Sequence, residues 1–180
     1  MKVTILPVGK VAEDVLQSIQ DGLREVIPEC EMTILEKAMS LPREAYNESR
    51  RQYHSTQILN KMNRYLGKTE GEYVLGVIEA DLYVPNFSFV FGEAGCPGSV
   101  AVISLFRLKP EFHGEPHNKQ LFQERAVKEA VHEIGHMLGL EHDGNPSCVM
   151  FFSNSIRDTD RKSVKFCDDC HMLVHRALEK

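Results

Sequence analysis

The sequence predicts a single-domain α/β (α+β) fold. Residues 2–8 and 30–34 have the alternation of short strands, and the apolar residues between them recur about every fourth position. This strand–helix–strand order is typical of a βαβ crossover. A longer apolar helical face runs from about residue 118 to 138. With 42% hydrophobic and 26% charged residues and no linker, residues 1–180 are expected to form one cooperative unit.

The first half of the chain is expected to alternate strands with helices. The first helix ends before Pro28, because proline cannot continue a helix. A second helix is expected at residues 55–66, with Ser55 as its cap and Gly67 closing it. The apolar run 73–79 then predicts a strand buried on both faces. The stripe that identifies the first helix consists of Val11, Val15, Ile19, Leu23 and Val26.

The second half of the chain begins with a predicted hairpin. Its strands are expected at residues 87–91 and 99–108, on either side of a glycine-rich turn. The elements expected after it are a loop at 109–119, the long helix at 118–138, a mostly irregular segment at 141–166 and a short helix at 168–179.

Charge and cysteine usage narrow the function classes. The 21 basic and 26 acidic residues are interspersed and sum to −5, whereas a nucleic-acid-binding surface needs a concentrated basic face. The N-terminal apolar run is too short for a signal peptide or a membrane span, so a cytoplasmic location without a membrane partner is expected. An odd number of cysteines fits a disulfide framework poorly and a thiolate metal site better. Two of them stand apart, Cys30 and Cys96, and three gather near the end, Cys148, Cys167 and Cys170.

The motif H-E-x-x-H lies within the long predicted helix. Two histidines four residues apart, His132 and His136, share one helix face and can reach one metal ion. Alone this pattern is weak, since an incidental polar pair on a helix looks the same. Here it continues through Gly139, which can end the helix in the left-handed conformation, to His142, which then swings back beneath the other two.

Three histidine ligands predict a catalytic zinc ion, because tetrahedral zinc then keeps one position for water or substrate. Glu133 is expected to act as general base and then general acid in amide hydrolysis. Met150 follows His142 at short range, a pattern typical of a methionine turn packed under the metal site. An isolated methionine would otherwise be core filler.

On these residues the sequence resembles the metzincin clan of metallopeptidases. Cys148, two residues before Met150, and the later Cys167-x-x-Cys170 pair make it resemble the archaemetzincin family in particular. The stretches that resemble this family outside the motif are residues 46–59 and 76–108.

The resemblance implies a metzincin-like fold. A twisted, mixed, mostly parallel sheet would carry an antiparallel strand along a cleft, and this strand would bind extended peptide through its backbone. Matched by order, it corresponds to Phe87–Phe91, which could equally be an ordinary buried strand. Residues 1–139 would form an upper subdomain. Residues 140–180 would form a lower one, with His142, the methionine turn and the cysteines.

A second, structural zinc ion is also expected. Cys148, Cys167 and Cys170 supply three thiolates, and tetrahedral zinc takes four ligands. Archaemetzincins place another cysteine directly after the third histidine, where this chain has Asp143, and a carboxylate can also ligate zinc. The alternatives are three reduced cysteines without metal, or a fourth ligand drawn from His171, His175 and water.

The sequence thus predicts a zinc metallopeptidase with a catalytic and a structural Zn²⁺, acting on a peptide or protein. One alternative is a zinc-stabilised module that binds peptides or proteins with little turnover, although such a module has no need of Glu133. Another is hydrolysis of a non-peptide amide. The C-x-x-C-H pattern at 167–171 also matches haem attachment, but that reaction occurs outside the cytoplasm. The oligomeric state is left open.

Overall fold

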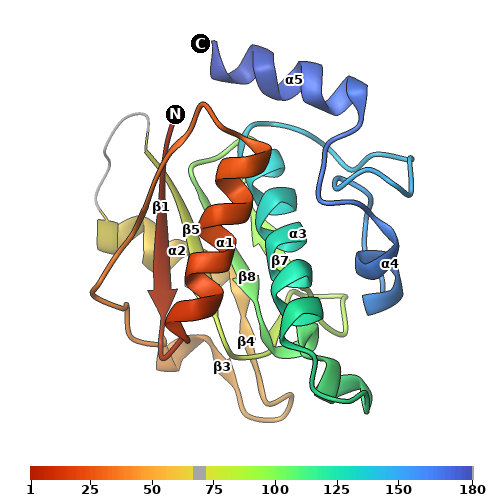
Figure 1. Cartoon of the computed structure of the whole chain (residues 1–180). Helices are drawn as coiled ribbons and strands as arrows, with labels where there is room; N and C mark the ends of the chain where they lie inside the picture. The colour runs from red at the N-terminus through yellow and green to blue at the C-terminus, as the bar shows by residue number, and fades with distance from the viewer. Residues whose placement is uncertain (67–71, 180) are drawn as a thin grey trace.

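The computed structural model describes residues 1–66 and 72–179 (Figure 1). Its large sheet has the strand order β2-β1-β5-β8-β7. Four strands are parallel, and β7 runs antiparallel at one edge beside β8. The predicted mixed α/β architecture is confirmed. The strands are β1 (Lys2–Val8), β2 (Glu31–Ile34), β5 (Glu72–Ile78), β7 (Gly92–Ala94) and β8 (Val100–Ser104).

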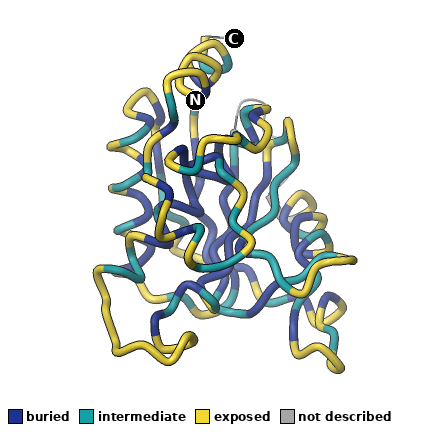
Figure 2. Tube along the Cα trace, turned by 90° about the vertical axis from the view of Figure 1, so that its right-hand side faces the viewer, coloured by how far each residue is buried: buried dark blue, intermediate teal, exposed yellow. Residues whose placement is uncertain are grey.

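Helices cover both faces of this sheet. Helices α1 (Glu13–Val26) and α3 (Lys119–Met137) lie side by side on one face, and α2 (Ser55–Leu66) lies on the other (Figure 1). Two apolar cores result, one on each face. The buried centre of the molecule follows the strands, as the dark tube in Figure 2 shows. The sheet is therefore a scaffold enclosed between helices, and its edge at β7 lies next to α3.

The strand residues explain why both faces are covered. In β1, Ile5 packs in the core beneath α1 and α3, whereas its neighbour Leu6 packs in the core beneath α2. Gly76 in β5 permits the close approach of α2, since a Cβ there would lie 2.7 Å from Met62 Sδ. Strands that are apolar on both faces need this double cover.

Short elements beside the main sheet were not predicted. A three-stranded sheet of order β3-β4-β6 adjoins the N-terminal end of α2, and a 3₁₀ helix precedes it in the chain. Strands of two or three residues carry no readable periodicity. The elements are η1 (Arg43–Ala45), β3 (Tyr46–Asn47), β4 (Gln52–His54) and β6 (Leu82–Tyr83).

The predicted hairpin is displaced along the chain. Phe87–Phe91 is not a strand of the sheet, and the antiparallel strand is Gly92–Ala94. The aromatic alternation at 87–91 belongs to a loop that has one isolated bridge, between Val90 and Leu82. The second strand ends at Ser104, because the chain turns there into η2 (Phe106–Leu108) and then η3 (Pro110–His113).

One further prediction differs in detail. The segment expected to be irregular contains α4 (Ile156–Arg161), whose N-terminus is fixed by a capping box between Ser155 and Asp158. The terminal helix, α5 (Asp168–Leu178), is confirmed. Helix α2 begins at Ser55, whereas the expected closing residue Gly67 lies outside the described residues. No helix in the described part of the chain is long and apolar enough to cross a membrane.

Candidate metal centre

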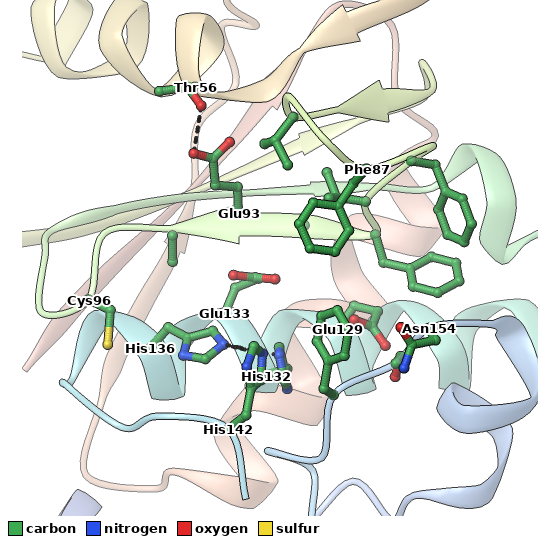
Figure 3. Close-up of a pocket in the computed structure, with 18 of the residues that line it drawn as sticks. Thr56, Phe87, Glu93, Cys96, Glu129, His132, Glu133, His136, His142 and Asn154 are labelled. Carbon is green, nitrogen blue, oxygen red and sulfur yellow. Dashed lines mark hydrogen bonds between the residues drawn. The ribbon is translucent and has the colours of Figure 1, made fainter.

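The three histidines predicted as ligands come together at the C-terminal end of α3 (Figure 3). His136 Nε2 lies 3.1 Å from His132 Nε2 and 3.2 Å from His142 Nε2. Tetrahedral zinc with Zn–N bonds of about 2.0–2.1 Å would hold two such nitrogens roughly 3.3 Å apart. The spacing therefore fits three imidazoles around one zinc ion.

Gly139 makes the chain reversal that brings in the third histidine. Its φ is +91°, the left-handed conformation expected from the sequence. The N–H of Leu140 donates to Gly135 (3.0 Å) and the N–H of Gly139 donates to His136 (2.9 Å), which is the Schellman pattern of a helix end. The chain then doubles back and places His142 against the helix.

The outer nitrogens of two ligands are held by backbone carbonyls. His132 Nδ1 lies 2.8 Å from the Val149 carbonyl, and His136 Nδ1 lies 2.7 Å from the Leu140 carbonyl. A carbonyl only accepts, so each Nδ1 carries a proton and each Nε2 lone pair faces the centre. Burial lowers the pKa of all three imidazoles, that of His132 most strongly. Neutral imidazole is the form that binds metal.

Glu133 lies buried between α3 and the edge strand β7 (Figure 3). Its Oε2 has no hydrogen-bond partner among the described residues. A Cβ on Gly92 of β7 would lie 2.4 Å from Glu133 Oε1, so any larger residue at that position would displace the carboxyl group. Burial, and secondarily the charge of Glu129, raises the pKa of Glu133 well above its usual value.

Met150 packs directly beneath the helix turn that carries the ligands. It is buried, and a Cβ on Gly135 would lie 2.4 Å from its Sδ. The second variable position of H-E-x-x-H is therefore a glycine for a steric reason. The thioether supports the turn from below, where the sequence placed the methionine turn.

A cleft of about 730 Å³ opens above the three histidines. Residues 86–94 line its upper wall, residues 152–154 its lower wall, and α3 its floor. Glu93 accepts hydrogen bonds from the hydroxyls of Ser55 and Thr56 (2.7 Å for Thr56). Ser55, which was predicted as the cap of α2, thus helps to hold Glu93 in the cleft wall.

Glu129, one turn before Glu133 on α3, also lines the cleft. Its carboxylate accepts a hydrogen bond from Thr159 (3.0 Å) and lies 3.1 Å from Nζ of Lys162. Lys162 and Glu129 are both buried, so their charges compensate each other within the protein.

The second predicted cluster also comes together. Ligand atoms of Asp143, Cys148, Cys167 and Cys170 lie within 4.8 Å of one another. Asp143 Oδ2 is 3.5 Å from Cys167 Sγ and 3.4 Å from Cys170 Sγ. Burial raises the pKa of the Cys170 thiol, so a cation is needed to hold it as a thiolate. Three sulfurs and one carboxylate oxygen fit a four-coordinate zinc ion.

The alternatives for the fourth ligand lie elsewhere. His171 and His175 are exposed on α5, and the centroids of their rings lie 5.9 Å apart. Neither belongs to the group of four formed by described residues, whereas Asp143 does. Cys30 is buried apart from both clusters, and Cys96 lines the cleft.

The model of peptidase family M54 matches residues 1–176. The chain belongs to this family. The archaemetzincin of Methanocaldococcus jannaschii is 48% identical over 170 residues, which cover 94% of this chain and 90% of that protein. The archaemetzincin of Pyrococcus abyssi is 41% identical, covering 99% and 96%. The resemblance to archaemetzincins is thereby confirmed.

Solved archaemetzincins of the same family share the fold. That of Archaeoglobus fulgidus, in complex with malonate, aligns with a TM-score of 0.82 at 43% identity, over 96% of this chain and 99% of the other. That of Methanopyrus kandleri aligns with a TM-score of 0.87 at 36% identity, over 100% and 96%. As a member of family M54, the chain is a zinc metallopeptidase, a hydrolase that acts on peptide or protein substrates.

Several residues of the peptidase site escaped the sequence analysis. Gly92 and Gly135 shape the site only through close approaches, and Phe152 lies two residues after Met150 on the cleft wall. Glu129 carries a local signal, since it stands four residues before Glu133 on the same helix face. Lys162 carries no local signal, because its partner Glu129 is distant in sequence.

Proposed function

We propose that this metallopeptidase binds its catalytic zinc through His132, His136 and His142 and uses Glu133 as general base and acid. The zinc, when bound, polarises the scissile carbonyl and lowers the pKa of water. Glu133 Oε2, which lacks a partner among the described residues, takes a proton from the attacking water and passes it to the departing amine. The observation that carries this proposal is the convergence of three Nε2 atoms beside that carboxyl group.

Strand β7 is proposed to align the substrate. It is the last strand of its sheet and pairs with β8 on one side, so its other edge is turned away from the sheet. An extended peptide can add to such an edge through backbone hydrogen bonds. Gly92 in this strand lies against Glu133, so a peptide paired to β7 passes next to the general base.

The second zinc is proposed to be structural. Asp143, Cys148, Cys167 and Cys170 offer four ligand atoms, which complete a tetrahedral set. They would join the loop after α3 to the start of α5. Residues 1–139 and 140–180 would then form an upper and a lower subdomain on the two sides of the cleft.

The proposal is tested by metal analysis together with peptide cleavage. We expect two zinc ions per chain, loss of cleavage after chelation, and recovery on adding zinc. His142→Ala should lose one zinc and all cleavage, whereas His175→Ala, which changes an exposed histidine of α5, should lose neither. Full cleavage by chelated protein would refute the catalytic zinc. Peptide binding without cleavage would instead support the binding module.

A further inference from the structure

Two exposed phenyl rings meet edge to face among the residues that line the cleft. Phe87 on the upper wall is 47% exposed and Phe152 on the lower wall is 36% exposed. Their ring centroids are 6.3 Å apart, and the Phe152 ring lies 4.8 Å from the ring of His142. Apolar surface is thus held open to solvent directly beside the metal ligands. Clustered exposed apolar surface in a cleft is typical of a ligand-binding site.

The upper ring is on a segment fixed by side chains from the small sheet. Arg50 Nη2 donates to the carbonyls of Phe87 (2.8 Å) and Ser88 (3.0 Å), and Gln52 donates to the Ser88 carbonyl (2.9 Å). The guanidinium of Arg50 also lies 4.4 Å over the ring of Tyr83. Phe87 is therefore positioned before any ligand arrives, which reduces the entropy lost on binding.

The lower ring lies on the segment between Met150 and α4, and α4 is bound to α3. Thr159 of this helix donates to Glu129 of α3, and Asp160 accepts two hydrogen bonds from Arg125 of α3 (2.7 and 2.8 Å). These contacts tie the segment that follows Phe152 to the floor of the cleft. Hydrogen bonds therefore hold in place both of the cleft walls that carry the rings.

The charges around the two rings are already compensated. Besides Glu133, the acidic residues that line the cleft are Glu93 and Glu129. Glu93 accepts from two hydroxyls, and Glu129 is paired with buried Lys162, so neither offers a free carboxylate to a basic side chain. No lysine or arginine is among the described residues that line the cleft. The mouth of the cleft thus favours an uncharged, apolar group.

We propose that Phe87 and Phe152, here called the phenyl bracket, bind a large apolar side chain of a residue that flanks the scissile bond. This rests on the proposed function, because it takes the His142 site as the place of hydrolysis. The substrates would be peptides with phenylalanine, tyrosine, leucine or methionine next to the cleaved bond.

The first test compares cleavage of matched peptides by the zinc-loaded protein. A degenerate peptide library should show large apolar residues enriched at one flanking position and charged residues depleted there. Replacing that residue by alanine should lower kcat/KM about tenfold or more. Phe87→Ala and Phe152→Ala should each reduce this ratio about threefold or more. Phe106→Ala, an exposed phenyl outside the cleft lining, is the matched control and should leave it unchanged.

The second test needs no turnover. Acetohydroxamic acid and phenylacetohydroxamic acid both bind zinc, and calorimetry gives their dissociation constants. The phenyl compound should bind about tenfold more tightly to the zinc-loaded protein, and this ratio should shrink in Phe87→Ala and Phe152→Ala. Equal binding of both compounds, or a ratio unmoved by both variants, would overturn the phenyl bracket. A preserved ratio in a protein that cleaves no peptide would overturn the proposed function and leave the bracket standing.

Discussion

The two candidate metal-binding clusters of this peptidase are built in opposite ways. The three-histidine cluster takes two ligands from one helix turn, and backbone carbonyls orient their rings. The aspartate–cysteine cluster takes its ligands from two loops and the start of α5, far apart in sequence. The first is centred on one helix turn and has neutral donors. The other is a junction of loops whose donors carry negative charge when metal is bound.

The clusters also differ in access. His142 is exposed and faces the cleft, whereas Cys148 and Cys170 are buried. Three ligands beside a cleft suit a zinc ion that exchanges water for substrate, and four ligands away from it suit an ion that only holds the chain together. Ligand number and exposure together therefore separate catalysis from support.

The two clusters are nevertheless linked. His142 of the first cluster is followed directly by Asp143 of the second, and the N–H of Asp143 donates to the Met150 carbonyl (3.0 Å). Cys148 and Met150 share the same turn. An ion in the second cluster would thus restrain both the third catalytic ligand and the methionine under α3.

Glu133→Gln should show the largest effect and sharpen the division of roles. Glutamine keeps the shape but cannot take a proton, so kcat should fall by about 10²–10⁴ while both zincs stay bound. Glu25→Gln, at an exposed position of α1, is the control and should keep full activity. Zinc content and peptide cleavage are measured side by side. Activity above half of wild type would contradict the role of Glu133.

Cys170→Ser should break the supporting cluster. Without this buried thiolate the second zinc is lost, and the melting temperature should fall by about 10 °C or more, since each kcal/mol is worth about 2–4 °C at this size. Because the clusters are linked, zinc affinity at the histidines should also drop. Cys30→Ser changes a buried cysteine apart from both clusters and should keep both zinc ions and the zinc affinity at the histidines. Two zincs and an unchanged melting temperature in Cys170→Ser would exclude the structural site.

Gly135→Ala tests the contact between the ligand helix and the methionine turn. The new methyl would lie 2.4 Å from Met150 Sδ, and the thioether must shift within a packed core. We expect a cost of about 1–2 kcal/mol, or a melting temperature lower by about 3–6 °C. At Gly144 a Cβ meets nothing within 4 Å, so Gly144→Ala is the matched control. Equal melting temperatures for the two variants would contradict the tight contact.

Asp143→Asn should have the smallest effect. It removes one negative charge while keeping an oxygen that can accept from the N–H of Asn145, as Asp143 Oδ1 does (2.6 Å). Affinity for the second zinc should fall roughly tenfold, with cleavage nearly unchanged. Asp143→Cys should bind that zinc at least as tightly as the natural chain. Competition with a zinc chelator measures the zinc affinity of both variants. Equal affinities of Asp143→Asn and the natural chain would show that Asp143 is no ligand.

The parts of the molecule that the sequence revealed are those with local signals. His132, His136 and Gly139 follow one another at helical spacing, and α3 needs no distant contact to present them. Asp143 could be predicted for the same reason, because it directly follows His142. Strands β5 and β8 were likewise predictable, because burial on both faces leaves a continuous apolar run, and β1 and β2 were predictable from their alternation.

The parts that escaped depend on distant partners. Phe87–Phe91 alternates like a strand, yet Arg50 and Gln52 hold the loop through its carbonyls, and no local pattern encodes that. Helix α4 is only six residues long, too short for an apolar stripe, although Ser155 and Asp158 did mark its start. The charge of Glu129 on α3 is compensated by Lys162, which directly follows α4. Such pairs become visible only once the chain is folded.

The order of elements along the chain has a consequence for biosynthesis. The last described strand of the large sheet ends at Ser104, whereas the first proposed zinc ligand is His132. All described strands of the scaffold therefore leave the ribosome before any proposed ligand does. The proposed zinc sites can thus be completed only after the sheet has been synthesised, and the last proposed thiolate, Cys170, is made only when translation is nearly finished.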